Sequence, residues 1–374
     1  MWELWWVWTW LVLDSCLRFA LLCLRVLAPA RPAGGGAAAA GGSLVLVAAH
    51  DEGGVIGPTV AALKAQLEEW PGSCLWVIAD RCRDETAAEA AAAGARVVAR
   101  REGRLGKGAV IAWWLEAHPA EWEGRAAVVV LDADSRLAPG SLAALGRTIG
   151  AGADAAQAFV APRAVGRAGR LAGWSEVLMQ RIDDEARRRC GWPVPLRGTG
   201  MALRAGLLAE LAPRLHTLAE DLELDVLLAA RGARVLFVPE AVVYDPKPQQ
   251  SGGAARQRAR WLQGQFQILR GYPRELLGAL ARGGPGAWVL LLLLMMRPKT
   301  LFIGLRLLAA LLGLGGPALM GLAMDAAYYL AGAGFVDDRR RYLLDLLAVP
   351  RYAAMWLHGL GLAAIRRGWL RAGR

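Results

Sequence analysis

Val128-Val129-Val130-Leu131-Asp132-Ala133-Asp134-Ser135 is the most informative stretch of the chain. Its apolar run shows no polar alternation, which is typical of a strand buried on both faces. Two carboxylates follow with no basic residue beside them, and desolvating paired carboxylates is unfavourable. A divalent cation such as Mg2+ or Mn2+ is the usual remedy, so Asp132 and Asp134 are candidate metal ligands. In the alternative interpretation, Asp134 or Ser135 only caps the next helix.

The same order of elements repeats along the neighbouring sequence. Buried strands are predicted over residues 43–49, 74–79, 96–99 and 126–131, and helices follow them over 55–69, 84–93, 107–118 and 139–150. Repeated βα units indicate an α/β fold with a mostly parallel sheet and helices on both faces. Ligands of such sheets bind beyond the carboxyl ends of the strands. The polar residues that fall there are His50, Asp51, Glu52, Asp80, Asp132 and Asp134.

Three other segments carry further residues suited to ligand binding. Gly106-Lys107-Gly108 places flexible backbone and a cation ahead of a helix, as suits a phosphate, although a surface loop has the same composition. Leu196-Arg197-Gly198-Thr199-Gly200-Met201 is a glycine-punctuated turn where backbone can approach a ligand. Glu220 and Asp221 stand at a helix start, where simple capping that favours the helix dipole is the alternative.

Gln257, Arg260 and Trp261 stand at positions i, i+3 and i+4 of a predicted helix and so lie close to one face. Such a face can hold a diphosphate through Arg and offer Trp as a platform for a sugar ring. The alternative is an amphipathic helix that lies on a membrane surface.

Taken together, seven short motifs occur in a fixed order. They are A-H-D-E (49–52), A-D-R-C (79–82), G-K-G (106–108), D-A-D (132–134), G-T-G (198–200), A-E-D (219–221) and Q-R-A-R-W (257–261). The ordered set, which is far more specific than any one motif, resembles family 2 glycosyltransferases of the GT-A fold over about residues 43–265. The chain ends are also similar to those of cellulose-synthase-like and hyaluronan-synthase-like members.

The resemblance implies a role for each motif. The residues implied to bind the donor nucleotide, its diphosphate or the acceptor are Ala49, Glu52, Asp80, Lys107, Asp132, Gln257, Arg260 and Trp261. Asp132 and Asp134 would hold Mg2+ or Mn2+, and Asp221 would be the catalytic base. Two positions depart from the family pattern: His50-Asp51 replaces the commoner Asn-Glu, and Arg81 stands where Asn or a second acid often follows. Arg81 is positioned to change base or sugar preference.

Both ends of the chain have the composition of membrane segments. Residues 5–27 are apolar apart from Asp14, Arg18 and Arg25, and the arginines toward their C-terminal side predict an uncleaved anchor with the next domain in the cytosol. A cleaved signal peptide and an in-plane helix are the alternatives. Near the other end, residues 287–296 and 301–335 predict a hairpin that crosses the bilayer twice, and an interfacial helix over 287–296 is the alternative. Residues 343–365 with the basic tail would lie at the lipid interface.

These features divide the chain into five predicted parts. They are a transmembrane anchor (1–30), a flexible linker (31–42), a cytosolic GT-A domain (43–275), a transmembrane hairpin (285–335) and an interfacial basic tail (336–374). A mean hydropathy of +0.31 is consistent with a full α/β domain plus apolar segments. The net charge is +11, but the sequence has no basic stripe interleaved with aromatic residues, which argues against nucleic acid as a partner. Five cysteines without pairing or His neighbours predict reduced residues.

The predicted function is a membrane-bound, inverting glycosyltransferase at the cytosolic face of the plasma (inner) membrane. It would take a nucleotide-diphosphate sugar, a UDP-sugar by family resemblance, and a lipid-linked or membrane-proximal saccharide acceptor. A homo-oligomer or a membrane partner protein is compatible with this function. Two alternatives remain: a sugar nucleotidyltransferase, which does not explain Q-R-A-R-W, and a non-catalytic membrane protein that binds a nucleotide sugar.

Overall fold

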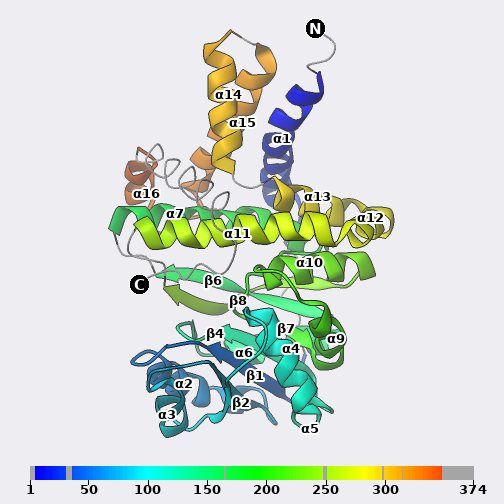
Figure 1. Ribbon diagram of the computed structural model, residues 1–374. Coiled ribbons are helices and arrows are strands. Elements are labelled where there is room, and N and C mark those ends of the chain that lie inside the picture. The colour runs from blue at the N-terminus through cyan, green and yellow to red at the C-terminus, as the bar shows by residue number, and fades with distance from the viewer. Residues whose placement is uncertain are drawn as a thin grey trace.

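The computed structural model describes residues 5–30, 36–163, 166–246, 251–296, 299–313 and 315–347. In Figure 1 the sheet and its covering helices form the lower part of the molecule, and α7 (Gly166–Leu178) and α11 (Ser251–Gly271) form a layer above it. Helices α1 (Trp5–Leu27), α14 (Lys299–Leu311) and α15 (Gly316–Gly332) project beyond that layer. Both ends of the described chain therefore lie on the same side of the sheet.

One eight-stranded sheet carries the fold, in the order β3-β2-β1-β4-β7-β6-β8-β5. The strands are β1 (Ser43–Ala49), β2 (Cys74–Asp80), β3 (Arg96–Arg100), β4 (Ala127–Asp132), β5 (Arg136–Leu137), β6 (Ala155–Arg163), β7 (Met201–Arg204) and β8 (Val235–Pro246). The first four in space are parallel, which confirms the predicted βα units. The other half is mixed, because β7 runs antiparallel to β4 and β6, and β5 antiparallel to β8.

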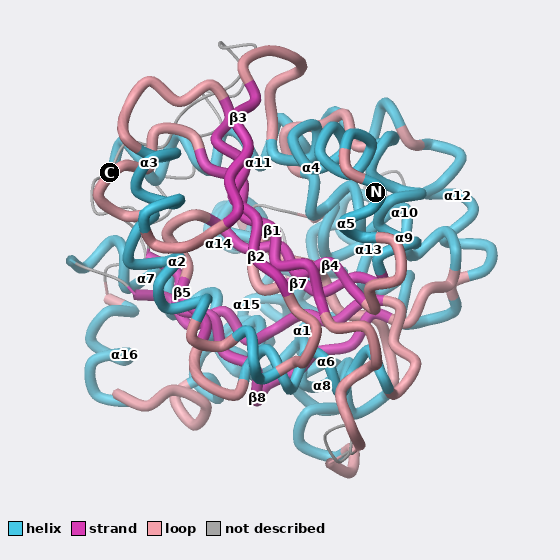
Figure 2. The backbone as a smooth tube through the Cα atoms, turned by 90° about the horizontal axis from the view of Figure 1, so that it is seen from below, coloured by secondary structure: helices cyan, strands magenta, loops and turns pink. Residues whose placement is uncertain are grey.

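Helices cover both faces of the sheet because its central strands are apolar on both sides. In β1, Leu44 and Leu46 face one hydrophobic core, whereas Val45 and Val47 face the other. The first core is completed by α4 (Lys107–Ala117), α9 (Ala205–Leu211) and α10 (Glu220–Arg231), the second by α2 (Ile56–Lys64), α3 (Thr86–Ala92) and α6 (Ser141–Gly150). Figure 2 shows α2 and α3 on one side of the strands and α4 on the other.

The terminal helices are joined by a buried ion network. Arg306 of α14 is fully buried, and its guanidinium lies 2.6 Å from Asp14 Oδ1 of α1 and 2.7 Å from Asp325 Oδ2 of α15. Ser15 Oγ donates to Asp325 Oδ1 at 3.0 Å. The N-terminal helix therefore packs against the C-terminal pair through charged groups as well as apolar ones.

The predicted membrane-spanning segments are wrong. Among the residues described, every helix is too short or too interrupted by charge to cross a bilayer. The C-terminal region forms α13 (Gly284–Met295), α14 and α15, of 12, 13 and 17 residues, whereas a span needs about 20. α1 has 23 residues but carries Asp14 and Arg18, which bind Arg306 and Asp183. The anchor (1–30), the transmembrane hairpin (285–335) and the integral-membrane localisation are corrected accordingly.

Two other predicted parts are only partly described. Residues 36–42 of the predicted linker run beside α6, where Ala39 N donates to Gly146 O at 3.0 Å and Trp70 Nε1 donates to Ala39 O at 2.7 Å. In the predicted tail, α16 (Arg339–Leu346) begins after Asp338, whose side chain accepts from Arg341 N. Residues 31–35 and 348–374 lie outside the described residues. The remaining helices are α5 (Pro119–Trp122), α8 (Glu185–Cys190) and α12 (Pro273–Arg282), with a π-helical turn over Met179–Asp184.

Candidate active site

The predicted site residues begin where three neighbouring strands end. Ala49 closes β1, Asp80 closes β2 and Asp132 closes β4. These strands are adjacent and parallel, with Ala49 paired to Ala79 and Ala48 paired to Asp132. The three carboxyl ends therefore meet at one edge of the sheet, where ligands of α/β sheets bind.

Lys107 contacts the first carboxylate of the D-A-D motif. It is the first residue of α4, and its Nζ lies 2.5 Å from Asp132 Oδ1 and 2.6 Å from the carbonyl oxygen of Gly198. Burial lowers the pKa of Lys107, but the carboxylates of Asp132 and Glu220 outweigh burial and raise it overall. The ammonium therefore stays charged and links the G-K-G, D-A-D and G-T-G motifs.

The charge of Asp134 is less well balanced by nearby cations than the charge of Asp132. Burial, together with the charges of Asp132 and Asp245, raises the pKa of Asp134 to about 7. Asp245 stands near the end of β8, a strand that pairs with β5 just after the D-A-D motif. Sequence reasoning missed Asp245, although an acid at the end of an alternating strand was a usable signal. The three carboxylates concentrate negative charge around one point.

The loop formed by the G-T-G motif (residues 198–200), called here the glycine loop, holds the turn that carries Asp132. Thr199 is buried, and its hydroxyl accepts from Asp132 N at 3.2 Å and donates to Ser135 Oγ at 3.0 Å. Gln157 Nε2 donates in turn to Thr199 O at 3.0 Å. Gly200 has φ +64°, and a Cβ there would lie 2.4 Å from Val243, so only glycine fits. The G-T-G motif signalled this loop, but nothing in the sequence pointed to Gln157.

Glu220 and Asp221 face the same loop from the start of α10. A Cβ placed on Gly198 would lie 3.7 Å from Glu220 Oε1 and 3.8 Å from Asp221 Oδ2. Burial and the neighbouring Asp221 raise the pKa of Glu220 to about 7. Asp221 Oδ1 also accepts from Leu222 N at 2.8 Å within the first turn of α10, so its carboxylate contacts the helix backbone as well as facing the loop.

Helix α11 brings Arg260 toward these acids. A Cβ on Gly264 would lie 2.5 Å from Ala219 Cβ, so the two helices approach closely only because both residues are small. Burial lowers the pKa of Arg260. The carboxylates of Glu220, Asp132 and Asp221 are close enough to oppose this shift. Trp261 is 42% exposed. The side chain of Gln257 lies outside the described part of α11.

The predicted nucleotide pocket is lined with ion pairs. Asp80 Oδ1 lies 2.7 Å from Arg100 Nη1, and its Oδ2 lies 2.5 Å from Arg81 Nη2. Arg81 adopts φ +52°, an uncommon conformation for a non-glycine residue and one that tends to occur at ligand-binding loops. Glu52 N donates to Thr86 Oγ1 at 2.7 Å. Arg81, a departure from the family pattern, therefore forms an ion pair with Asp80, the carboxylate that the family resemblance assigns to nucleotide binding.

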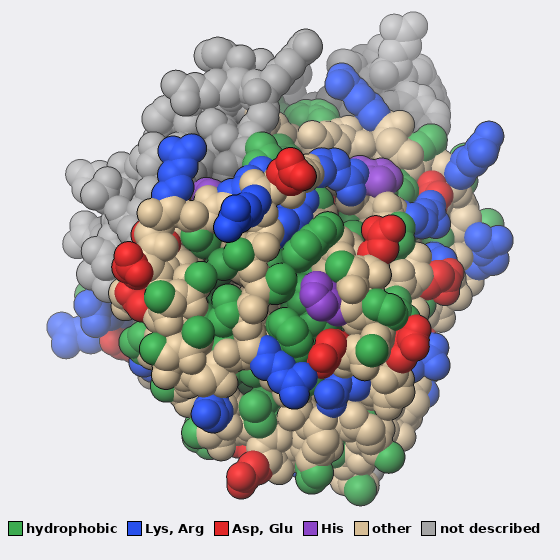
Figure 3. All heavy atoms as spheres, turned by 60° about the horizontal axis from the view of Figure 1, so that its bottom comes forward, with side chains coloured by type: hydrophobic (Ala, Val, Ile, Leu, Met, Phe, Trp, Pro, Cys, Tyr) green, Lys and Arg blue, Asp and Glu red, His purple; other side chains and the backbone are tan. Residues whose placement is uncertain are grey.

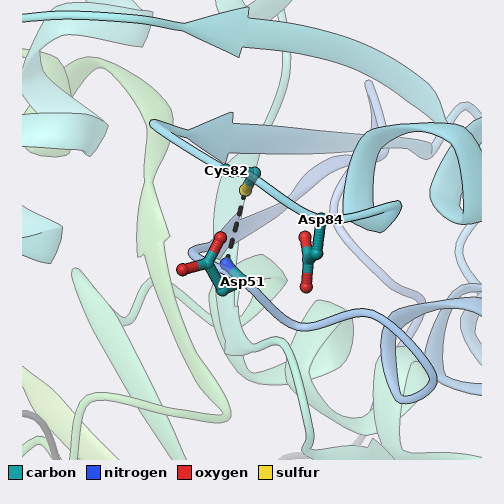
Figure 4. A group of neighbouring side chains, drawn as sticks. All are labelled: Asp51, Cys82 and Asp84. Carbon is teal, nitrogen blue, oxygen red and sulfur yellow. Dashed lines mark hydrogen bonds between the residues drawn. The ribbon is translucent and has the colours of Figure 1, made fainter.

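A second acidic group stands beside this pocket. Asp51, Cys82 and Asp84 place one ligand atom each within 4.8 Å of one another, the only such group of three in the described chain (Figure 4). The carboxylates are occupied by backbone, however, since Asp51 Oδ1 accepts from Arg83 N and Asp84 Oδ2 accepts from Gly53 N. Burial raises the pKa of the Cys82 thiol. These residues join the loop after β1 to the loop after β2 through hydrogen bonds to backbone, which is not the arrangement of a metal centre.

The sequence of the central region identifies its family. Residues 41–264 match the family model described as glycosyltransferase like family 2. The chain belongs to this family. It is therefore a glycosyltransferase, and the resemblance inferred from the ordered motifs is confirmed at family level. No curated protein matches the chain.

Solved structures of glycosyltransferases show similar folds. The mannosyltransferase PcManGT from Pyrobaculum calidifontis, in complex with GDP-Man and Mn2+, is 18% identical with a TM-score of 0.52, over 96% of this chain and 100% of that one. Glucosyl-3-phosphoglycerate synthase from Mycobacterium tuberculosis, in complex with Mn2+, UDP and phosphoglyceric acid, is 20% identical with a TM-score of 0.40, over 71% and 81% of the two chains. At 18% identity the first likeness supports a GT-A-like α/β fold.

Proposed function

We propose that this glycosyltransferase moves a sugar from a nucleotide-diphosphate sugar to an acceptor hydroxyl with inversion at the anomeric carbon. The observation that carries the proposal is the meeting of Lys107, the D-A-D carboxylates, Asp221 and Arg260 around the glycine loop. This set contains cations for a diphosphate and a carboxylate for an acceptor proton. The motif of α11 also supports a narrower place among cellulose-synthase-like members.

The acidic residues fit a divalent cation. Burial and the neighbouring acids raise the pKa of Asp134, which supports a cation there, and Asp132 and Asp134 would supply two oxygen ligands. Mg2+ and Mn2+ sites in nucleotide enzymes commonly use one or two carboxylates and take other ligands from the phosphates. The similar mannosyltransferase was solved with Mn2+. When bound, the cation would offset the charge of the departing diphosphate.

The chain's own residues would perform the remaining steps. Lys107 and Arg260 hold the diphosphate, while Trp261 gives the acceptor sugar a flat apolar platform. Asp221 takes the proton of the acceptor hydroxyl as its oxygen bonds to the anomeric carbon. The bond from that carbon to the diphosphate oxygen breaks, and the nucleoside diphosphate leaves on the opposite face. One displacement inverts the centre, so no carboxylate nucleophile is needed.

For the donor base we propose uracil, and for the acceptor a lipid-linked or other saccharide. Ala49, Glu52 and Asp80 would surround the base, which is supported by their position at or just beyond the ends of β1 and β2. Uracil can donate its imide N–H to Asp80 only if Arg81 turns away, so selectivity should depend on Arg81. Exposed apolar side chains on α14 and α15, such as Leu308 and Leu319, support an acceptor with an apolar part.

Release of nucleoside diphosphate from a panel of nucleotide sugars, with and without Mn2+, tests the function. Metal-dependent release that rises with added acceptor supports transfer. Release of pyrophosphate from a nucleoside triphosphate and a sugar phosphate would instead identify a nucleotidyltransferase. Donor binding without any release under all conditions would identify a non-catalytic binding protein.

A further inference from the structure

A second group of buried charges lies beside the glycine loop. Three arginines from separate elements meet there with the two aspartates that end the π-helical turn, and leucines of α13 close one side. The residues that line this cavity include Arg18, Asp183, Asp184, Arg187, Arg197, Leu290, Leu293 and Leu294. We call it the arginine pocket.

Two of the arginines have carboxylate partners and one does not. Arg18 Nη1 lies 3.1 Å from Asp183 Oδ2, and Arg197 pairs with Asp184. Arg187 is only 2% exposed, yet among the described residues it makes no ion pair. Its one hydrogen bond there is a long one of 3.4 Å from Nη1 to Pro193 O, and its Nε has no partner.

A buried guanidinium without a close partner is costly, because its hydration is lost and little replaces it. Burial lowers the pKa of Arg187, and the carboxylates of Asp184 and Asp183 oppose this shift only in part. Arginine nevertheless remains charged in proteins. Asp183 and Asp184 are already paired with Arg18 and Arg197, so the guanidinium of Arg187 is the group that a bound anion would contact directly. The planar fork of a guanidinium matches a phosphate better than it matches a simple halide.

The position of the pocket relates it to the acceptor and not to the donor. Arg197 directly precedes Gly198, the glycine that Asp221 faces, so the pocket and the proposed base adjoin the same short loop. The donor diphosphate is assigned to Lys107 and Arg260, which are outside the pocket. Leu290, Leu293 and Leu294 share one face of α13 and give the arginine pocket an apolar wall.

We propose that Arg18, Arg187 and Arg197 bind the phosphate group of a phosphorylated acceptor, with an apolar tail along α13. This inference rests on the proposed transfer function and names its substrate class. The free space is about 20 Å³, room for a water molecule. A phosphate is larger, so the leucine side chains of α13 must turn outward when it binds.

Binding of inorganic phosphate and of dodecyl phosphate to the full chain tests the proposal without donor and with chelator present. Calorimetry should detect both anions and should not detect dodecanol. Arg187→Gln should weaken binding at least about tenfold, since a charge-assisted hydrogen bond is worth that much or more. Arg231→Gln, which alters an exposed pair with Glu210, is the matched control and should bind normally. Equal affinity in Arg187→Gln and wild type overturns the proposal.

Two further measurements keep the test independent of folding and of transfer. Leu294→Phe should reduce phosphate binding by filling the pocket while every charge stays in place; unchanged binding there would also overturn the proposal. UDP with Mn2+ should not displace the anion, whereas competition would place the anion in the donor site instead. Tighter binding of dodecyl phosphate than of inorganic phosphate would identify a lipid-linked acceptor, and equal binding a soluble phosphomonoester.

Discussion

Lys107 Nζ lies 2.5 Å from Asp132 Oδ1, while Asp134, two residues further on, has no ion pair in the described chain. The two carboxylates of the motif are thus unequal before any ligand binds. Lys107 already balances Asp132, and the charge of Asp134 is opposed by burial and by Asp132 and Asp245. Asp134 therefore gains more than Asp132 from a bound cation.

The first prediction is that Asp134→Asn abolishes the metal dependence of donor binding and leaves the fold intact. The amide removes a charged ligand without changing the size of the side chain. Titration of a nucleotide sugar with and without Mn2+ measures the effect, and Glu116→Gln, an exposed change on α4, is the control. Unchanged donor affinity with full metal dependence in Asp134→Asn would refute the metal assignment.

The second prediction concerns pH. Because the folded-state pKa of Asp134 is raised to about 7, above its ordinary value, folding favours the protonated form. Without metal, at a pH between the ordinary pKa of an aspartate and about 7, Asp134 keeps its proton in the folded protein but loses it in the unfolded chain. The stability that this group contributes is therefore lost as the pH rises toward 7. Metal needs the deprotonated form, so Mn2+ affinity should fall as pH drops below about 7. A Mn2+ affinity in wild type that is flat between pH 6 and 8 would contradict this prediction.

The third prediction assigns the base. Asp221→Asn should keep donor affinity and lose about 10²–10⁴-fold in turnover, the range usual for a missing general base. The amide oxygen can still accept from Leu222 N, so this contact with the helix backbone survives. Single-turnover transfer with saturating donor separates the two roles. Turnover close to wild type would leave Asp221 with its capping role alone.

The fourth prediction is that Trp261→Ala lowers transfer about fivefold by weakening acceptor binding, because an aromatic contact of this kind is worth on the order of 1 kcal/mol. Phe266→Ala offers a matched control, since Phe266 is also an exposed aromatic on α11, at 54% against 42% for Trp261. Donor affinity should not change in either variant. Equal activity losses in Trp261→Ala and Phe266→Ala would show that the exposed aromatic residues of α11 act only as general apolar surface, and that Trp261 has no specific role in acceptor binding.

The parallel half of the sheet was predictable because its strands are short apolar runs that end in polar residues. β1 over Ser43–Ala49 has the predicted bounds, and the other three parallel strands end within one residue of them. The mixed half was not predicted, since β7 and β8 owe their pairing to contacts far apart in sequence. The motif residues were found because glycines and acids mark turns, whereas Asp245 and Gln157 depend on how β8 and β6 return to the site.

The terminal helices were misjudged for a physical reason. Their composition resembles that of membrane spans, but Arg306, Asp14 and Asp325 stand far apart in the sequence and meet only in the fold. A hydropathy argument counts each charge as an isolated cost, whereas the structure pairs them in the interior. The arginine pocket escaped notice for the same reason, because its three arginines come from α1, α8 and the glycine loop.

The fifth prediction tests that ion network. Arg306→Met leaves Asp14 and Asp325 buried without their partner, and breaking a buried ion pair in this way costs about 3–5 kcal/mol. Burial already raises the pKa of Asp325, so the variant should regain part of its stability as pH falls and the carboxylates take up protons. Denaturant unfolding at pH 8 and pH 5 measures both effects. Arg231→Met, which breaks an exposed pair with Glu210, should change stability by less than about 1 kcal/mol. A loss in Arg306→Met as small as in this control, or one that grows at low pH, would show that the network does not hold α1 against α14 and α15.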